Sequence, residues 1–357
     1  MIQGSHQRQR KPLLSQLRAY LIRHLWALSI PTATINKSSV DEFPNSSEAH
    51  VAPRTLDDIL GPDVRPFLGK SWGRSVTHIP GFPGKFGALM PWPALNSILE
   101  QHHGKLVRLS QGGQTLDSRS YQNANSLRHV QTSKLLADGA TLILDEAEQF
   151  YRPLRDLITN LEKLFRGHVQ ANLYASFTEV NGFSVHHDSQ DTIILQVSGR
   201  KHWKVFYPRE EHPLKNATNI PLKELRVVWE GILNDGDALH VPRGYPHLVT
   251  PLLEPTLHLT VTFTPMTGVD LLKWVVERVA EDTHARTNVP VFSELSEQQE
   301  WIDAIRKSML SRLDGGVVER FLAANEARHE RPIFALPMSV LAALTPGVPE
   351  MERSHRQ

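Results

Sequence analysis

Eight short segments between residues 169 and 263 constrain the fold of this chain more than any other feature of its sequence. Most of them are bounded by Gly, Pro, Asn or Asp, and several alternate polar and apolar residues, as half-buried strands do. The predicted strands are 169–177, 182–187, 192–197, 202–206, 227–229, 238–241, 247–252 and 257–263. Short strands at this spacing predict a jelly roll or a related two-sheet barrel, which covers its edges and can enclose a ligand.

Helical patterns flank the predicted barrel, so we expect a mainly β protein with flanking α-helices. Thr55 is placed to cap a first helix, and an apolar strand at 140–144 leads into an amphipathic helix at 146–165. Apolar residues return to a helical period after residue 269, with further helices at 297–310 and 317–325. The predicted divisions are 1–54 as a basic tail and linker, 55–268 as the barrel with its N-terminal elements, 269–335 as a helical region, and 336–357 as a C-terminal tail.

Composition excludes several classes of protein. The chain has no cysteine, which excludes disulfides, thiolate metal ligands and a cysteine nucleophile, and fits a cytoplasmic location. No run of about 18 apolar residues is present, so no membrane span is expected. The net charge of +1 gives no overall attraction to nucleic acid. Residues 1–40 contain basic residues but no Asp or Glu, which is typical of a disordered tail, a docking arm or a targeting segment.

A His-x-Asp pair carries the first chemical signal. On a strand, residues two apart point to the same face, so His186 and Asp188 can converge on one ion while His187 points the other way. The turn–strand–turn pattern at 235–244 places His247 at the start of another strand. Two imidazoles and one carboxylate form the facial triad typical of non-haem Fe(II) oxygenases. A His-x-Asp pair alone arises by chance in a His-rich chain, so this prediction depends on the whole pattern.

Lys201 is the second candidate residue. It follows a Gly-containing turn at the head of a predicted strand, from which its side chain can extend into the barrel. A buried ammonium there would bind the far carboxylate of a dicarboxylate co-substrate through a charge-assisted contact. Arg200 is the alternative, because adjacent strand residues face opposite ways and only one of the two can point inward. A lysine after a turn can also be an ordinary surface residue.

Polar residues alternate with apolar ones on two further strands. His258, Thr260 and Thr262 share one face of the last predicted strand, while Leu259, Val261 and Phe263 would face the core. A similar polar stripe of Asn172, Tyr174 and Ser176 precedes the His-x-Asp pair. Each stripe is either the lining of a pocket or the solvent face of a half-buried strand. Their position beside the candidate metal site favours the pocket.

The chain resembles the JmjC-domain 2-oxoglutarate oxygenases, specifically their ribosomal-oxygenase (cupin-4-like) branch. The resemblance covers most of the chain, from near Leu56 into the helices after Val269. The matching motifs are Asn172-x-Tyr174, Gly182-Phe183, His186-x-Asp188, Gln196-x-x-Gly199-Arg200-Lys201-x-Trp203, and Gly236-Asp237-x-Leu239-x-x-Pro242-x-Gly244-x-x-His247.

This resemblance implies an Fe(II)- and 2-oxoglutarate-dependent enzyme that uses O2 and releases succinate and CO2. His186, Asp188 and His247 would be the iron ligands. The expected co-substrate contacts are Lys201, Thr260 and Tyr174. The expected substrate contacts are Asn172, Tyr174, Thr262 and His258. Such enzymes hydroxylate a side chain, commonly the β-carbon of His or Arg, in a peptide or protein, and they use the helices after the barrel to form a homodimer.

The substrate and the reaction type stay open at this point. Too few residues follow the barrel for the family's usual C-terminal winged-helix domain, which we expect to be reduced or absent. A ribosomal protein and a ribosomally made natural-product precursor are therefore both candidate substrates. The alternatives are a JmjC N-methyl demethylase, which would share all four residues, and a non-catalytic cupin-like binding protein. A cupin enzyme without 2-oxoglutarate would normally carry three His and a Glu.

Overall fold

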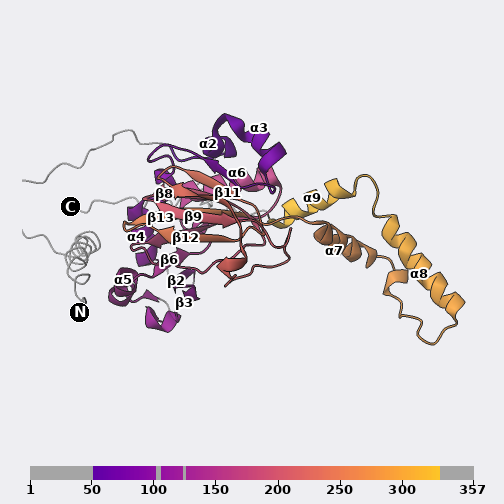
Figure 1. Ribbon diagram of the computed structural model, residues 1–357. Coiled ribbons are helices and arrows are strands. Elements are labelled where there is room, and N and C mark those ends of the chain that lie inside the picture. The colour runs from indigo at the N-terminus through magenta and orange to yellow at the C-terminus, as the bar shows by residue number, and fades with distance from the viewer. Residues whose placement is uncertain (1–50, 102–105, 124–125, 330–357) are drawn as a thin grey trace, which may run out of the picture. The chain divides into compact units, whose positions relative to one another are not determined.

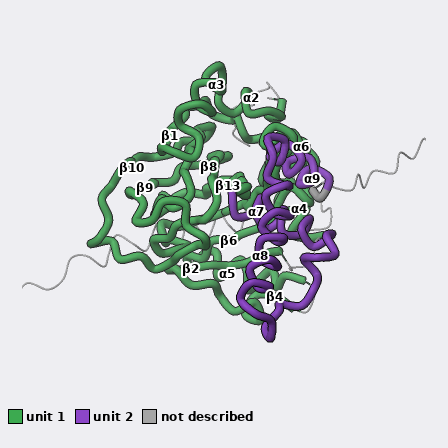
Figure 2. Tube along the Cα trace, turned by 90° about the vertical axis from the view of Figure 1, so that its right-hand side faces the viewer, with its two compact units in different colours: residues 1–267 green, residues 268–357 purple. Residues whose placement is uncertain are grey.

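The computed structural model describes residues 51–101, 106–123 and 126–329 (Figure 1). The chain forms two compact units, residues 1–267 and residues 268–357, which we describe separately (Figure 2). Most of the predicted basic tail and all of the predicted C-terminal tail at 336–357 lie outside the described residues. The predicted functional residues all lie in the first unit.

An antiparallel sheet of eight strands forms the larger wall of the first unit (Figure 1). In spatial order its strands are β1 (Thr77–Ile79), β11 (Ala238–Val241), β8 (Asp191–Ser198), β13 (Thr256–Phe263), β7 (Val169–Ser176), β6 (Thr141–Leu144), β2 (Val107–Gln111) and β3 (Gln114–Thr115). The predicted strands at 169–177, 192–197, 238–241 and 257–263 are confirmed to within one residue at each end. A separate pair joins β4 (Gln122–Asn123) to β5 (Ser126–Leu127).

A smaller antiparallel sheet of three strands faces the larger one. Its spatial order is β10 (Val227–Leu233), β9 (Lys201–Phe206) and β12 (His247–Pro251). β10 runs four residues past its predicted end, because Leu233 pairs with Lys201 at the start of β9. The buried side chains that join the sheets are Ile194, Leu239 and Val241 from the larger sheet and Trp203, Val205 and Leu233 from the smaller. The predicted two-sheet, mainly β architecture with flanking helices is confirmed.

The predicted strand at 182–187 is wrong as a continuous strand. This segment makes only two single antiparallel bridges, one between His186 and His247 and one between His187 and Ala217. It passes between β12 on one side and a loop on the other, so neither neighbour provides a ladder of several residues. The alternation of side chains is nevertheless kept, since His186 and His187 bond to opposite neighbours.

The two faces of the larger sheet differ in polarity, as predicted for its last strand. In β13, Leu259, Val261 and Phe263 are buried in the main apolar core, whereas His258, Thr260 and Thr262 point into the space between the two sheets. Leu154, Leu157, Ile158 and Leu161 of helix α6 (Arg152–Phe165) lie in the same core. One face of the sheet therefore stabilises the fold and the other is free to line a cavity.

Short helices lie before and between the first strands of this unit. Besides α6, the α-helices described in this unit are α2 (Leu56–Leu60), α3 (Val64–Pro66), α4 (Trp92–Gln101) and α5 (His129–Ala137). Thr55 caps α2 as predicted, because its hydroxyl accepts from the Asp58 N–H while the Asp58 carboxylate accepts from the Thr55 N–H. The helix predicted at 146–165 begins later, at Arg152, with Pro153 in its first turn. Proline fits the first turn of a helix and disfavours helical backbone before it.

His240 of β11 joins the N-terminal segment to the larger sheet. Its side chain is fully buried; Nε2 accepts from the Gly73 N–H at 3.1 Å and Nδ1 donates to the Thr192 carbonyl at 2.9 Å. The ring stacks on Trp72, with 4.8 Å between ring centroids. The neutral ring uses Nδ1 as a donor and Nε2 as an acceptor, so protonation of Nε2 would break the hydrogen bond from the Gly73 N–H. Burial lowers the pKa of His240 to about 4.

We expect acid to destabilise the first unit through His240. Its pKa of about 4 in the folded chain lies below its ordinary 6.5, so the unfolded chain binds the proton more tightly. This contribution to stability is complete above pH 6.5 and is lost as the pH falls toward 4, with roughly 2 kcal/mol lost by pH 5. The free energy of unfolding of the H240N variant, measured in urea, should depend less on pH than that of the wild type. Parallel curves for the two proteins would contradict this role.

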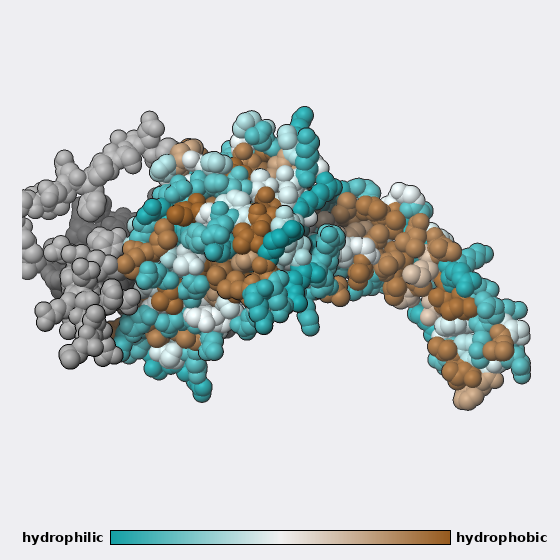
Figure 3. Space-filling view, in the orientation of Figure 1, coloured by the Kyte–Doolittle hydropathy of each residue, from teal (hydrophilic) through white to brown (hydrophobic). Residues whose placement is uncertain are grey.

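In its described residues, 268–329, the second unit contains the α-helices α7 (Gly268–Val279), α8 (Leu295–Leu310) and α9 (Val317–His329), so the predicted helices there are confirmed. Trp274 and Phe321 pack edge to face inside this unit. The apolar stripe predicted for α7 is only partly buried, since Leu272 and Val276 are exposed. Figure 3 shows apolar residues on the surface of these helices. The exposed apolar side chains of this unit include Val269, Leu295, Leu310 and Val318. The dimerisation role of this region stays a prediction.

Across the described residues, no helix is both long and apolar enough to cross a membrane. The predicted cytoplasmic location stays a prediction.

Candidate functional site

Three potential metal ligands come together where the segment at 185–188 meets β12. One ligand atom from each of His186, Asp188 and His247 lies within 4.8 Å of the others. Two backbone hydrogen bonds hold this arrangement, because His186 and His247 exchange N–H and carbonyl groups at 3.3 and 2.8 Å. The Asp188 carboxylate lies 4.0 Å from the His247 Nε2. The three residues predicted from the sequence are therefore neighbours in space.

Both imidazoles are oriented by the backbone. Nδ1 of His186 lies 2.9 Å from the Ser184 carbonyl, and Nδ1 of His247 lies 3.2 Å from the Tyr245 carbonyl. A carbonyl can only accept, so Nδ1 carries the proton and each Nε2 keeps a free lone pair. Burial, and then the neighbouring His186, lower the pKa of His247 to about 4, which keeps that ring neutral. This is the second-sphere pattern common to histidine ligands of metals.

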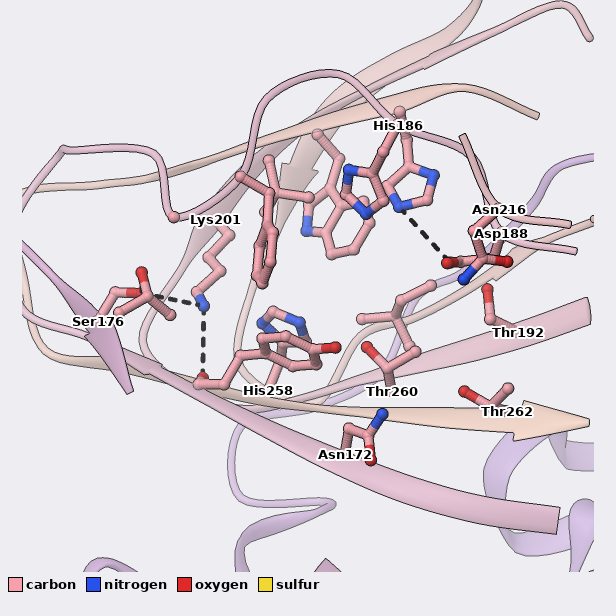
Figure 4. A pocket seen from close by; sticks show the side chains of 18 of the residues that line it. Asn172, Ser176, His186, Asp188, Thr192, Lys201, Asn216, His258, Thr260 and Thr262 are labelled. Atoms are coloured by element: carbon pink, nitrogen blue, oxygen red, sulfur yellow. Dashed lines mark hydrogen bonds and ion pairs between the residues drawn. The ribbon is translucent and has the colours of Figure 1, made fainter. Parts of the chain in front are cut away.

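A cavity of about 390 Å³ opens beside these ligands, between the two sheets (Figure 4). Its floor is built by register across three strands of the larger sheet. On β13, His258 pairs with Tyr174 of β7, while Thr260 lies between Asn172 of β7 and Ile194 of β8, and Thr262 lies between Gln170 of β7 and Thr192 of β8. All of the residues predicted to bind metal, co-substrate or substrate line this one cavity. The polar stripes are therefore pocket linings rather than solvent faces.

Lys201 closes one end of the cavity. Its side chain is 1% exposed, and Nζ lies 3.4 Å from both the Tyr174 carbonyl and the Ser176 hydroxyl. Among the described residues, no carboxylate forms an ion pair with it, and burial lowers its pKa to about 7. The neighbouring Arg200 points outward and pairs with Glu254 at 3.0 Å. The structure therefore places Lys201, not Arg200, inside the cavity.

Two further buried polar atoms near Lys201 have no hydrogen-bond partner among the described residues. They are the indole Nε1 of Trp203 and Nδ1 of His258. Trp203 lies two residues after Lys201 on β9, and its ring packs against those of His247 and His258, with centroids 5.8 and 5.6 Å away. Buried polar groups are rarely left without partners. An ammonium without an anionic partner and an indole N–H without a hydrogen-bond partner favour an anionic ligand at this end of the cavity.

The end of the cavity lined by Arg108 is polar, and the charged side chains described there are paired with each other. Arg108 and Asp145 neutralise each other through two hydrogen bonds of 2.5 and 2.7 Å. The Asn172 side-chain oxygen accepts from the Glu146 N–H at 3.0 Å. This end therefore suits a neutral polar group. Tyr174, whose carbonyl contacts Lys201, stacks on His258 with 4.8 Å between ring centroids, and burial raises the pKa of Tyr174 so that its phenol stays protonated.

Several cavity residues were not predicted. Trp203 could have been inferred from strand parity, since it shares a face with Lys201. Arg108, Gln190, Asn216 and Thr218 also line the cavity. They come from separate strands and loops and carry no periodic pattern, so nothing in the sequence distinguishes them from surface residues.

The central part of the chain matches a known domain model. Residues 147–271 match the JmjC domain model, and this range includes the three candidate ligands and Lys201. The chain is 25% identical over 284 residues to the bifunctional lysine-specific demethylase and histidyl-hydroxylase NO66 of Drosophila persimilis. This alignment covers 74% of this chain and 40% of that protein. The chain is also 29% identical over 237 residues to the NO66 of Caenorhabditis elegans, in an alignment that covers 62% of this chain and 31% of that protein. The chain thus spans less than half the length of these relatives.

A solved structure shares the fold. The crystal structure of the ribosomal oxygenase YcfD of Escherichia coli matches with a TM-score of 0.50 and 16% sequence identity. The match covers 80% of this chain and 78% of that one.

Proposed function

We propose that this JmjC-domain protein of the ribosomal-oxygenase type is an Fe(II)- and 2-oxoglutarate-dependent hydroxylase of a peptide or protein side chain. One observation carries the proposal: the His186–Asp188–His247 cluster shares a cavity with Lys201, a buried cation that has no anionic partner among the described residues. A cation of this kind destabilises the empty site and is compensated when a carboxylate binds beside it.

The ligand set fits Fe(II). Two neutral imidazoles and one carboxylate would hold the ion, and a set of three protein ligands would leave positions for a co-substrate and O2. A structural zinc site would need a fourth ligand and commonly uses cysteine, which the chain lacks. His186 and His247 would each bind through Nε2, because their Nδ1 atoms are held by backbone carbonyls.

The cavity also fits 2-oxoglutarate. Lys201 would hold the far carboxylate, and the indole N–H of Trp203 lies on the same face of β9. The phenol of Tyr174 and the hydroxyl of Thr260 line the wall on the facing sheet. When bound, iron and 2-oxoglutarate together supply the oxidation of an unactivated C–H bond with O2, and succinate and CO2 are the by-products. The protein contributes orientation and the exclusion of water.

We further propose that the target is a neutral polar side chain, with the β-carbon of histidine preferred over that of arginine. The carboxylate of Asp145 is already paired with Arg108, and Asp188 would be occupied by the metal. A substrate guanidinium or methylated ammonium would therefore enter without a counter-ion and would lie in a cavity that Arg108 also lines. The same reasoning disfavours N-demethylation. The names of the relatives carry both histidyl-hydroxylase and lysine-specific demethylase, so the choice between these activities rests on the charge argument.

The test is incubation of the purified protein with Fe(II), ascorbate, 2-oxoglutarate and peptides from ribosomal proteins or from natural-product precursors. We expect peptide-dependent succinate formation and a product that gains one oxygen atom on a histidine. Loss of a methylene unit from a methylated lysine would instead identify a demethylase, and oxygen on an arginine would overturn the charge argument. Failure of every peptide, together with no visible absorption band on anaerobic addition of Fe(II) and 2-oxoglutarate, would sink the proposal.

A further inference from the structure

The loop between β9 and β10, residues 207–226, passes directly over the segment that carries the ligands. His187 and Ala217 exchange two backbone hydrogen bonds of 3.0 and 3.2 Å, and the Ile220 N–H donates to the Val185 carbonyl at 3.1 Å. The loop also packs against Gly244, where an added Cβ would lie 2.8 Å from the Glu210 carbonyl oxygen. The loop is thus a fixed wall of the site.

Two loop side chains, Asn216 and Thr218, reach the cavity from positions two residues apart. Ala217 between them faces the other way and bonds to His187, as expected for extended backbone. Both residues are exposed, so they lie at the mouth of the cavity rather than in its depth. Figure 4 shows Asn216 beside Asp188, close to the candidate metal position.

The orientation of the Asn216 amide is fixed by its neighbour. Oδ1 accepts from both the N–H and the hydroxyl of Ser189, at 2.6 and 2.9 Å. A backbone N–H can only donate, so the atom facing it must be the oxygen, and Nδ2 points away from Ser189. Among the described residues, none accepts a hydrogen bond from Nδ2. Asn216 therefore presents two N–H donors at the cavity mouth.

We propose that Asn216 is a substrate-binding residue whose amide N–H group donates to a backbone carbonyl of the peptide that is hydroxylated. This inference rests on the proposed function, and it assigns to the loop a role that the sequence did not reveal. A peptide that brings a β-carbon to the metal must place its own backbone at the cavity mouth, where its carbonyls need donors. The anchor on Ser189 holds the donor in place before the peptide binds, which reduces the entropy cost of binding.

The carbonyl is the partner that fits best. A carboxylate at this point would lie close to Asp188 and be repelled by it, whereas a cationic group cannot accept a hydrogen bond. A neutral carbonyl avoids both conflicts, and every peptide supplies one whatever its sequence. Asn216 would therefore strengthen peptide binding in general and fix the register of the chain across the metal.

Two variants separate donation from anchoring. N216D keeps the oxygen that accepts from Ser189 but replaces the N–H group by a second oxygen, while N216A removes both. N219D is the matched control: Asn219 belongs to the same loop, its Oδ1 accepts from the Ser184 hydroxyl at 2.7 Å, and it does not line the cavity. Because N216D adds charge near Asp188, Mn(II) and 2-oxoglutarate affinities are measured for each variant alongside peptide binding.

The probe is a random 12-residue peptide library, selected on the full-length protein loaded with Mn(II) and 2-oxoglutarate. We expect the enriched peptides to bind N216A and N216D about three- to tenfold more weakly than the wild type, as for one lost hydrogen bond. N219D should bind them like the wild type, and N216A should keep its affinity for 2-oxoglutarate. Equal peptide binding by all the proteins would overturn the inference, as would weak binding by N216A alone, which would make Asn216 only an anchor.

An unproductive selection would also overturn the inference, because no peptide site would then exist at the cavity mouth. The proposed function is judged separately, by succinate formation in the wild type. If the wild type hydroxylates a peptide and the Asn216 variants have the same KM for that peptide as the wild type, the proposed function is supported and the role of Asn216 is wrong.

Discussion

Replacing Asp188 by alanine is expected to reduce peptide-dependent succinate formation by roughly a thousandfold, equivalent to about 4 kcal/mol in activation free energy. The carboxylate is the only anionic member of the ligand cluster, so its loss removes both a ligand and the charge that neutralises the cation. The fold should survive, because the Asp188 side chain is 28% exposed and its ion contact with His247 is 4.0 Å long.

The D138A variant is the matched control for this change. Asp138 lies at the end of α5, is exposed and does not line the cavity. Its replacement by alanine should leave both turnover and Mn(II) binding at wild-type levels. Thermal unfolding and Mn(II) binding measured by electron paramagnetic resonance complete the comparison. If D188A bound Mn(II) like the wild type and retained turnover, Asp188 would not be a ligand.

Local alternation was enough to predict which side chains face the cavity. Successive residues of a strand point to opposite faces, so the polar stripe of His258, Thr260 and Thr262 could be separated from Leu259 and Val261 before any partner strand was known. The same rule separated His186 from His187 even though their segment proved not to be a regular strand. Side chains alternate between two faces wherever the backbone is extended, whether or not the segment pairs as a regular strand.

What the sequence could not decide depends on partners far along the chain. Alternation showed only that one of Arg200 and Lys201 points inward, and the resemblance selected Lys201. The physical reason lies in Glu254, which pairs with Arg200 on the outside. Asn216 and Arg108 carry no periodic signal, because a loop and a separate strand bring them to the cavity through hydrogen bonds to Ser189 and Asp145. Such residues can be recognised as part of the cavity lining only from the folded structure.

Replacing Lys201 by methionine is expected to weaken 2-oxoglutarate binding by about a hundredfold, because a carboxylate in a dry cavity would lose its charged partner. The protein itself should be at least as stable, since a buried cation without an anion is replaced by an apolar side chain of similar length. R200M is the matched control, and it should leave 2-oxoglutarate binding unchanged because Arg200 is exposed and paired with Glu254. Calorimetric titration of the Mn(II)-loaded proteins measures each affinity.

The pH dependence of this affinity gives the assignment a second, independent readout. The free protein loses the Lys201 proton above a pKa of about 7, whereas the bound carboxylate requires the charged form. Binding therefore takes up a proton, and the wild-type affinity should fall as the pH rises above about 7, by up to about tenfold per unit. In K201R the cation cannot be deprotonated, so this fall should vanish. A wild-type affinity that is flat from about pH 7 to pH 9, or a K201M protein that binds 2-oxoglutarate normally, would show that the cation holding the co-substrate is not Lys201.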